Sequence, residues 1–232
     1  MKALETVTVE TGPNPTYAII WMHGLGADGH DFEPLVPELI GPGMPALRFV
    51  FPHAPVRPVT INNGYAMRAW YDIIGIDRRS AEDFKGITES AEAISGLVHR
   101  EHARGINSDR ILLAGFSQGG AMALHLATRH PDTFAGIVAL SCYLPLSRET
   151  RLRNTANLAT PIFMAHGTQD PVVPYMLGDE SRQLLEAAGY RVEWHDYPMP
   201  HSVGEPEVAD LRTWLKRVCA APVGAAAHAT TS

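Results

Sequence analysis

The sequence predicts a single-domain α/β fold, with a mostly parallel central sheet flanked by helices. Short apolar runs rich in Val, Ile and aromatic residues recur along the chain, bounded by Gly, Pro or Asn. Most of these runs are continuous, which is typical of strands covered on both faces. Helical patterns lie between the runs, and no linker or repeat divides the chain. We therefore expect residues 1–221 to form one domain.

Six expected strands and two clear helices make up this pattern. The strands are expected at residues 17–22, 46–51, 110–115, 135–140, 161–166 and 191–197. One helix follows Ser80, which forms with Asp83 the spacing of a capping box. Its apolar stripe is Ile87, Ala91, Ile94 and Val98, which leaves Glu89, Glu92, Arg100 and Glu101 to face water. A second stripe follows Pro206 and comprises Val208, Leu211, Leu215 and Val218.

The composition excludes several classes of protein. The 232 residues include 45% hydrophobic residues, enough to bury a full core. The formal net charge is -6 and no Lys/Arg run occurs, so we expect no nucleic-acid partner. The only cysteines, Cys142 and Cys219, lie far apart, which disfavours a disulfide framework or a cysteine zinc site and favours a reducing, cytoplasmic setting.

The sequence contains no pattern typical of a membrane-spanning or export segment. The first ten residues contain no apolar stretch typical of a secretory signal. The uncharged stretch 111–128 is interrupted by polar and glycine residues, so it predicts a strand, turn and helix and no stable membrane insertion. The Ala- and Thr-rich residues 222–232 are expected to form a disordered tail.

The first strand is followed by HGLGADG, residues 23–29, and a long excursion follows the second. Residues 56–79 of that excursion contain Trp70 and Tyr71 without helical periodicity. An excursion of this length is more often a functional loop than a simple connection.

The sharpest motif is GFSQGG, residues 115–120, between an expected strand and an expected helix. In this context a G-x-S-x-G sequence places its serine, Ser117, on a sharp turn with the hydroxyl exposed. The alternatives are a glycine-rich turn without chemistry and a phosphate-binding loop. The second is weaker, because the motif lies in mid-chain and lacks the G-x-G-x-x-G spacing.

A serine nucleophile needs a base and a residue that orients the base. Asp170 lies in HGTQDPVVP, just after the 161–166 strand, where open α/β sheets gather their sites. Taken alone, it is also compatible with an ordinary turn before Pro171. Among the downstream histidines, His201 alone occupies a loop between the last strand and the last helix, so we expect it to act as general base and then general acid.

The loop after the first strand predicts a second contribution to this chemistry. Enzymes that carry a G-x-S-x-G serine nucleophile on an α/β fold stabilise an oxyanion with two backbone N–H groups. One belongs to the residue after the nucleophile and the other to a loop that follows an early strand. These donors would be Gln118 and, within HGLG, Leu25. The same loop is also compatible with a plain glycine turn.

Metal catalysis is disfavoured by the histidine pattern. No H-E-x-x-H sequence occurs, and His99 and His102 lie beside charged residues on an expected solvated helix face. Cys142 is expected to be a small buried residue rather than a nucleophile. We therefore expect no metal and no organic cofactor.

These motifs occur in the order found in a known family. The chain resembles the bacterial carboxylesterases related to acyl-protein thioesterases and lysophospholipases, which are small single-domain α/β-hydrolases. The resemblance covers roughly residues 15–215, and its motifs are HGLGADG, FPHAP, GFSQGG, HGTQDPVVP and MPHSV. It implies the α/β-hydrolase fold. It also implies Ser117, Asp170 and His201 as nucleophile, acid and base, with Leu25 and Gln118 as oxyanion donors.

The resemblance also implies a substrate-contacting segment. The family's tryptophan followed by aspartate matches Trp70-Tyr71-Asp72, so Trp70 and Met67 are candidate substrate contacts; the alternative is a lid that packs onto the core. Together the motifs predict a carboxylesterase that forms an acyl-enzyme on Ser117 with small soluble esters. Two alternatives stay open: an acyl-protein thioesterase or lysophospholipase with the same triad, and a non-catalytic binding module. The chain is expected to be a monomer or a homodimer.

Overall fold

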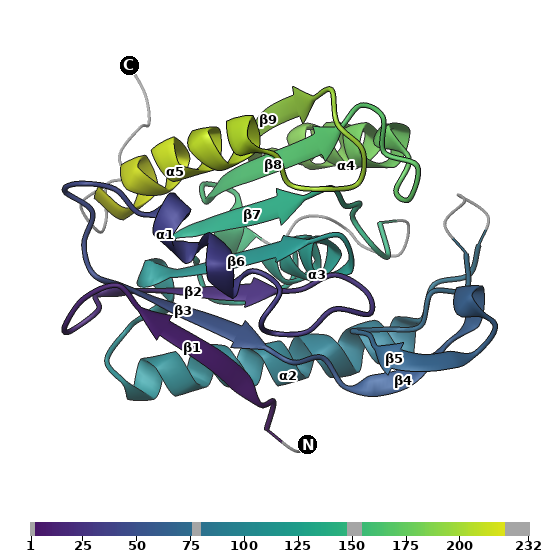
Figure 1. The fold of residues 1–232 in the computed structure, drawn as a ribbon, viewed down its shortest axis with the longest axis horizontal. Helices are drawn as coiled ribbons and strands as arrows, with labels where there is room; N and C mark the ends of the chain where they lie inside the picture. Colours follow the sequence, from purple (N-terminus) through teal and green to yellow (C-terminus); the bar gives the residue numbers. More distant parts are fainter. Residues whose placement is uncertain (1–2, 76–79, 148–154, 221–232) are drawn as a thin grey trace.

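The computed structural model describes residues 3–75, 80–147 and 155–220, and its centre is a seven-stranded sheet (Figure 1). The strand order is β1-β3-β2-β6-β7-β8-β9. The first strand, β1 (Thr6–Glu10), pairs antiparallel with β3 (Leu47–Pro52), and every other pair in this sheet is parallel. The remaining strands are β2 (Tyr17–Met22), β6 (Ile111–Phe116), β7 (Gly136–Leu140), β8 (Pro161–Gly167) and β9 (Arg191–Tyr197). All six expected strands are confirmed, with ends within one residue of those predicted.

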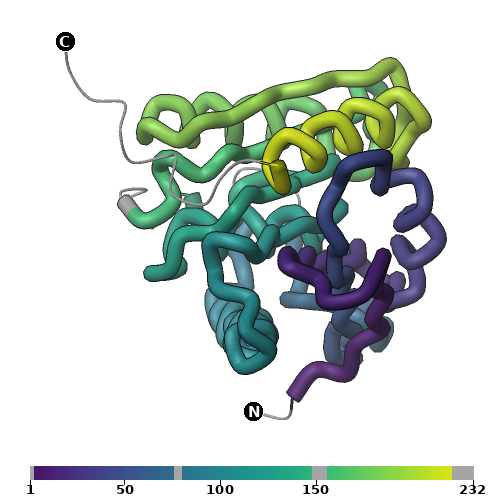
Figure 2. The backbone as a smooth tube through the Cα atoms, turned by 90° about the vertical axis from the view of Figure 1, so that its left-hand side faces the viewer, coloured from purple at the N-terminus to yellow at the C-terminus, as the bar shows by residue number. Residues whose placement is uncertain are grey.

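Helices cover both faces of the sheet, as predicted (Figure 1). One face packs against α2 (Phe84–Ala103), α3 (Gln118–Ala127) and α4 (Tyr175–Ala187), and the other against α1 (Val36–Leu39) and α5 (Glu205–Ala220). Figure 2 shows α5 in yellow beside the dark-blue segment of α1, and the two helices are in contact. Short 3₁₀ turns occur at Glu33–Leu35, Thr60–Asn62, Ser108–Arg110 and Thr155–Asn157.

The continuous apolar runs are explained by two separate cores. In β2, Ile20 and Met22 belong to the core under α2 and α3, whereas Ile19 and Trp21 belong to the core under α1 and α5. Successive side chains of a strand point to opposite faces. A strand covered on both faces therefore buries every residue.

Two features of the fold were not predicted. Strand β1 lies at the edge of the sheet, and its residues are half-buried or exposed. The excursion after β3 contains a hairpin of β4 (Val56–Val59) and β5 (Tyr65–Arg68), joined through Asn63 in the left-handed conformation with φ 56°. The hairpin extends from the end of the molecule toward which the parallel strands point (Figure 1).

The helix after Ser80 is present, but its expected start and one expected surface residue were wrong. Asp83, not Ser80, is the N-cap of α2, because its carboxylate accepts a hydrogen bond from the Gly86 amide at 2.9 Å. Glu101 is buried rather than solvated, since Arg48 of β3 lies 3.2 Å from its carboxylate. The expected tail, 222–232, lies outside the described residues.

None of the described helices is both long and apolar enough to cross a bilayer.

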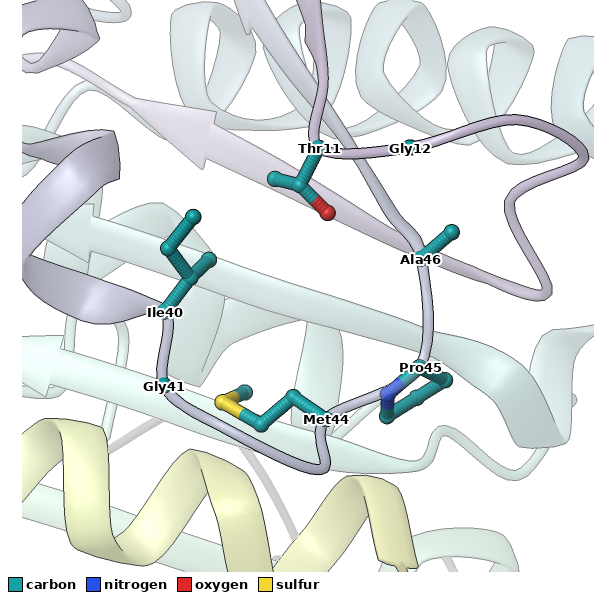
Figure 3. Close-up of a pocket in the computed structure, with 7 residues that line it drawn as sticks. All are labelled: Thr11, Gly12, Ile40, Gly41, Met44, Pro45 and Ala46. Carbon is teal, nitrogen blue, oxygen red and sulfur yellow. The ribbon is translucent and has the colours of Figure 1, made fainter.

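The surface carries a hollow of about 260 Å³ between residues 11–12 and the 40–46 segment (Figure 3). Because Ala46 immediately precedes β3, this hollow lies at the amino ends of the parallel strands, away from the sequence-predicted site.

Candidate active site

Ser117 occupies a strained turn between β6 and α3. Its backbone has φ 53° and ψ -121°, outside the conformations that L-residues favour, and its N–H donates to the Leu140 carbonyl at 2.8 Å. The turn requires glycine because a Cβ on Gly119 would lie 2.1 Å from the Met22 carbonyl oxygen. A Cβ on Gly115 would lie 2.2 Å from the Gly119 carbonyl carbon. The sharp turn predicted from GFSQGG is thus confirmed.

Asp170 and His201 form a direct pair. Nδ1 of His201 lies 2.6 Å from Oδ2 of Asp170, whose side chain is fully buried. The other carboxylate oxygen accepts from the backbone N–H groups of Val172 and Val173 at 2.8 and 2.9 Å. A buried carboxylate held in this way fixes which imidazole nitrogen faces it. The Nε2 atom of His201 is therefore left for a second partner.

The loops that carry these two residues are joined through their backbones. The amides of Thr168 and Gln169, in the turn before Asp170, donate to the carbonyls of Tyr197 and Met199 at 2.8 and 3.2 Å. A Cβ on Gly167 would lie 2.3 Å from the Met199 carbonyl oxygen, so only glycine permits this contact. These backbone contacts hold the two loops together and so keep His201 next to Asp170.

The imidazole of His201 lies next to the serine turn. Its ring packs against that of Phe116, with a centroid separation of 4.6 Å, and Phe116 is the residue before Ser117. The ring is mostly buried, with 14% of the side chain exposed. The structure therefore brings the three sequence-predicted residues to the same edge of the sheet, at the carboxyl ends of β6 and β8 and after β9.

Another histidine near the acid has a different role. His166 is buried, and its Nε2 donates to the Val173 carbonyl at 2.9 Å while lying 3.5 Å from Oδ2 of Asp170. Burial lowers the pKa of His166, so its ring is neutral near pH 7. It supports the turn that carries Asp170.

Hydrogen bonds hold the loop after β2 on both sides of Leu25. His23 is buried, its Nε2 accepts from the Ala54 amide at 3.0 Å, and its Nδ1–H donates to the Gly24 carbonyl at 2.7 Å. Burial lowers the pKa of His23, consistent with this neutral tautomer. The Gly26 amide donates to the Arg68 carbonyl at 2.9 Å. Within the described ranges, the amide of Leu25, between these fixed residues, donates to no protein acceptor.

The Gln118 amide is a further candidate donor. It is the first residue of α3, and the Ser117 side chain does not cap this helix. Among the hydrogen bonds of the described residues, none uses this N–H. A Cβ on Gly24 would lie 3.5 Å from that of Ser117, so the two donor segments meet at the serine. The Leu25 and Gln118 amides, which come from these two segments, are therefore candidate donors to a developing oxyanion.

The two candidate substrate contacts differ in their surroundings. The sulfur of Met67 lies 3.7 Å from where a Cβ on Gly26 would be, which places this half-buried side chain next to the oxyanion loop. Trp70 is 0% exposed and its indole N–H donates to the His23 carbonyl at 2.9 Å. The interpretation of Trp70 as a substrate contact is therefore corrected: its ring packs in the core, the alternative that the sequence left open.

Sequence reasoning missed the role of the Gln118 side chain. Its Oε1 accepts from the Trp70 amide and its Nε2 donates to the Tyr71 carbonyl, both at 2.8 Å. A glutamine after the nucleophile was the available signal, but its partners lie 47 and 48 residues away. Only the fold shows that they meet.

Other candidate chemistry finds no support among the described residues. No group of three or more His, Cys, Asp or Glu side chains there could hold a metal ion. The Cys142 thiol is fully buried and burial raises its pKa, so it is a poor nucleophile.

Residues 4–219 match a protein family described as Phospholipase/Carboxylesterase. Acyl-protein thioesterase 1 of Mycosarcoma maydis is 36% identical over 236 residues, which covers 94% of this chain and 98% of that protein. Acyl-protein thioesterase 1 of Cryptococcus neoformans is 35% identical over 218 residues, 86% of this chain and 91% of that protein. These relatives are fungal, whereas the motifs resembled bacterial carboxylesterases.

Solved structures agree with this fold. SOBER1 of Arabidopsis thaliana superposes with a TM-score of 0.82 at 31% identity and covers 87% of this chain and 98% of its own. Acyl-protein thioesterase 2 of Zea mays gives a TM-score of 0.82 at 28% identity, with 93% and 99% covered.

Proposed function

Because this chain belongs to the phospholipase/carboxylesterase family of α/β-hydrolases, we propose that it hydrolyses acyl esters through a covalent acyl-enzyme on Ser117. The observation that carries this proposal is the buried Asp170–His201 pair, 2.6 Å long, beside the strained Ser117 turn. A carboxylate, an imidazole and a serine in this order are the parts that acyl transfer requires.

In the proposed mechanism, Nε2 of His201 removes the Ser117 proton as the serine oxygen attacks the acyl carbonyl carbon. Asp170 stabilises the resulting imidazolium. The carbonyl oxygen becomes an oxyanion and accepts hydrogen bonds from the amides of Leu25 and Gln118, each worth about 10² to 10³ in rate. The intermediate collapses, His201 gives its proton to the leaving oxygen, and water then releases the acid by the same steps.

The first candidate activity is that of a carboxylesterase on small esters, with Met67 at the edge of the acyl site. The second candidate is acyl-protein thioesterase activity, and the names of the relatives from Mycosarcoma maydis and Cryptococcus neoformans favour it. Both activities use the same triad. They differ in the leaving group and in the length of the acyl chain.

Hydrolysis of p-nitrophenyl acetate, butyrate, octanoate and palmitate tests the proposal, with Ser117→Ala as the control throughout. A short-chain optimum that Ser117→Ala abolishes supports a carboxylesterase of small esters. A long-chain optimum abolished by the same change, together with hydrolysis of a palmitoyl-cysteine peptide, supports the thioesterase. Absence of Ser117-dependent hydrolysis of every substrate contradicts both and favours a binding module.

A further inference from the structure

The two proposed oxyanion donors belong to separate segments of the chain. Leu25 lies in the loop after β2, whereas Gln118 begins α3. An oxyanion hole works only if its donors are held at fixed positions before the reaction. The two segments therefore need a rigid connection, in addition to their contact at Gly119.

Trp70 supplies such a connection, because its hydrogen-bonding groups are committed to both segments. Its indole N–H donates to the His23 carbonyl at 2.9 Å, two residues before Leu25. Its backbone N–H donates to the Gln118 side chain at 2.8 Å. Its carbonyl accepts a hydrogen bond from the buried Ser90 hydroxyl of α2, which anchors the bridge to the helix layer.

The neighbours of Trp70 strengthen the same connection. The Tyr71 carbonyl accepts from the Gln118 side chain at 2.8 Å, and the Arg68 carbonyl accepts from the Gly26 amide at 2.9 Å. Residues 68–71 thus contact the Leu25 loop on both sides of Leu25 and contact Gln118 through two hydrogen bonds. The Trp70 ring also packs against the His23 ring, with centroids 5.3 Å apart.

We propose that Trp70 is a positioning residue that holds the two oxyanion donors, the backbone N–H groups of Leu25 and Gln118, at fixed positions relative to Ser117. This inference rests on the proposed function, because it assigns Trp70 to the stabilisation of the acyl-transfer intermediate. It also gives a physical reason for a fully buried tryptophan within a long excursion. Trp70 acts through the two donor segments and does not touch the substrate.

The test is Trp70→Phe, which keeps an aromatic ring and removes the indole N–H. The chain offers a matched control in Trp21→Phe. Trp21 is 1% exposed and stacks on Phe32, and within the described part of the chain its Nε1 has no hydrogen-bond partner. Both changes shrink a buried tryptophan by the same volume, but only Trp70→Phe breaks a hydrogen bond to the oxyanion loop.

We expect Trp70→Phe to lower kcat for p-nitrophenyl butyrate by about 10- to 100-fold relative to Trp21→Phe, with KM changed less than about threefold. The inhibition constant of an alkyl boronic acid should rise by a similar factor, because its tetrahedral adduct on Ser117 places an oxygen in the oxyanion hole. A purely structural role would not single out the tetrahedral adduct. Equal kcat values for the two variants would overturn the proposal, as would a rise in KM alone, which would make Trp70 a substrate contact.

A second variant covers the case in which Trp70→Phe does not fold. Gln118→Met removes the other side of the bridge but keeps the amide of residue 118, and we expect the same loss of kcat and of boronate affinity. Unchanged values would overturn the proposal. Ser117→Ala, assayed in parallel, distinguishes failure of the positioning role from failure of the proposed function. Ser117-dependent hydrolysis that is unaffected by the Trp70 change refutes the positioning role alone. Absence of Ser117-dependent hydrolysis refutes the proposed function and the positioning role with it.

Discussion

Replacing Glu207 with glutamine should stabilise the protein more strongly as the pH rises. Glu207 lies in the first turn of α5 and is 0% exposed. Its Oε2 accepts from the Gly204 amide at 3.4 Å, and its Oε1 has no hydrogen-bond partner among the described residues. Burial raises its pKa to about 8 from the ordinary value of 4.5. The folded chain therefore keeps this proton over a pH range in which the unfolded chain has released it.

The magnitude follows from linkage between protonation and folding. Between pH 4.5 and about 8 the unfolded state binds fewer protons at Glu207, so the contribution of this group to stability falls as the pH rises. Each pH unit in this window is worth about 1.4 kcal/mol at most. From pH 5 to pH 8 the full effect is about 4 kcal/mol, and relaxation of the surroundings lowers it to about 2 to 4 kcal/mol. Glutamine resembles the protonated carboxyl and does not ionise, so Glu207→Gln removes this loss.

The assay is urea denaturation of wild type and Glu207→Gln at pH 5, 6, 7 and 8. The difference in the free energy of unfolding between the variants should move in favour of glutamine by about 2 to 4 kcal/mol from pH 5 to pH 8. Groups that titrate independently of Glu207 cancel because both proteins carry them. A difference independent of pH would show that Glu207 is ionised in the folded protein and would refute the reasoning.

Two further predictions concern the acid and the glycines. Asp170→Asn should lower kcat on esters by about 10⁴, because an amide facing Nδ1 favours the wrong imidazole tautomer; parent-like turnover would place the orienting residue elsewhere. Gly119→Ala should destabilise the fold by about 3 kcal/mol or more, since its Cβ would overlap the Met22 carbonyl. Gly96 lies in the middle of α2 with nothing within 4 Å of an added Cβ, so Gly96→Ala should stabilise the folded protein by about 0.5 to 1 kcal/mol. Equal effects of Gly119→Ala and Gly96→Ala on thermal unfolding would contradict both expectations.

The parallel strands were predictable because their signal is local. Ile19 to Met22 are all apolar, since each faces one of two cores, and such a run is visible without knowing its neighbours. Strand β1 was missed because it is a half-exposed edge strand with a weaker apolar signal. The burial of Glu101 was missed because its partner, Arg48, lies 53 residues away in the sequence.

The site was predictable to the extent that its chemistry follows chain order. Ser117 is marked by its flanking glycines, and Asp170 and His201 each follow a strand that ends at the same edge of the sheet. What holds these residues in place is not local. The contact between Gly167 and Met199, and the bridge from Trp70 to His23 and Gln118, depend on long-range packing that no motif encodes.

Labelling with a fluorophosphonate tests the central claim most directly, because the probe reacts with a serine that is activated by a base and forms a stable adduct. We expect one adduct per chain, which peptide mass mapping assigns to Ser117. Ser117→Ala should abolish labelling and His201→Gln should slow it by at least about 10²-fold, with both variants folded by circular dichroism. Failure of the folded wild-type protein to react, or an adduct on another residue, would contradict the assignment of Ser117 as the nucleophile.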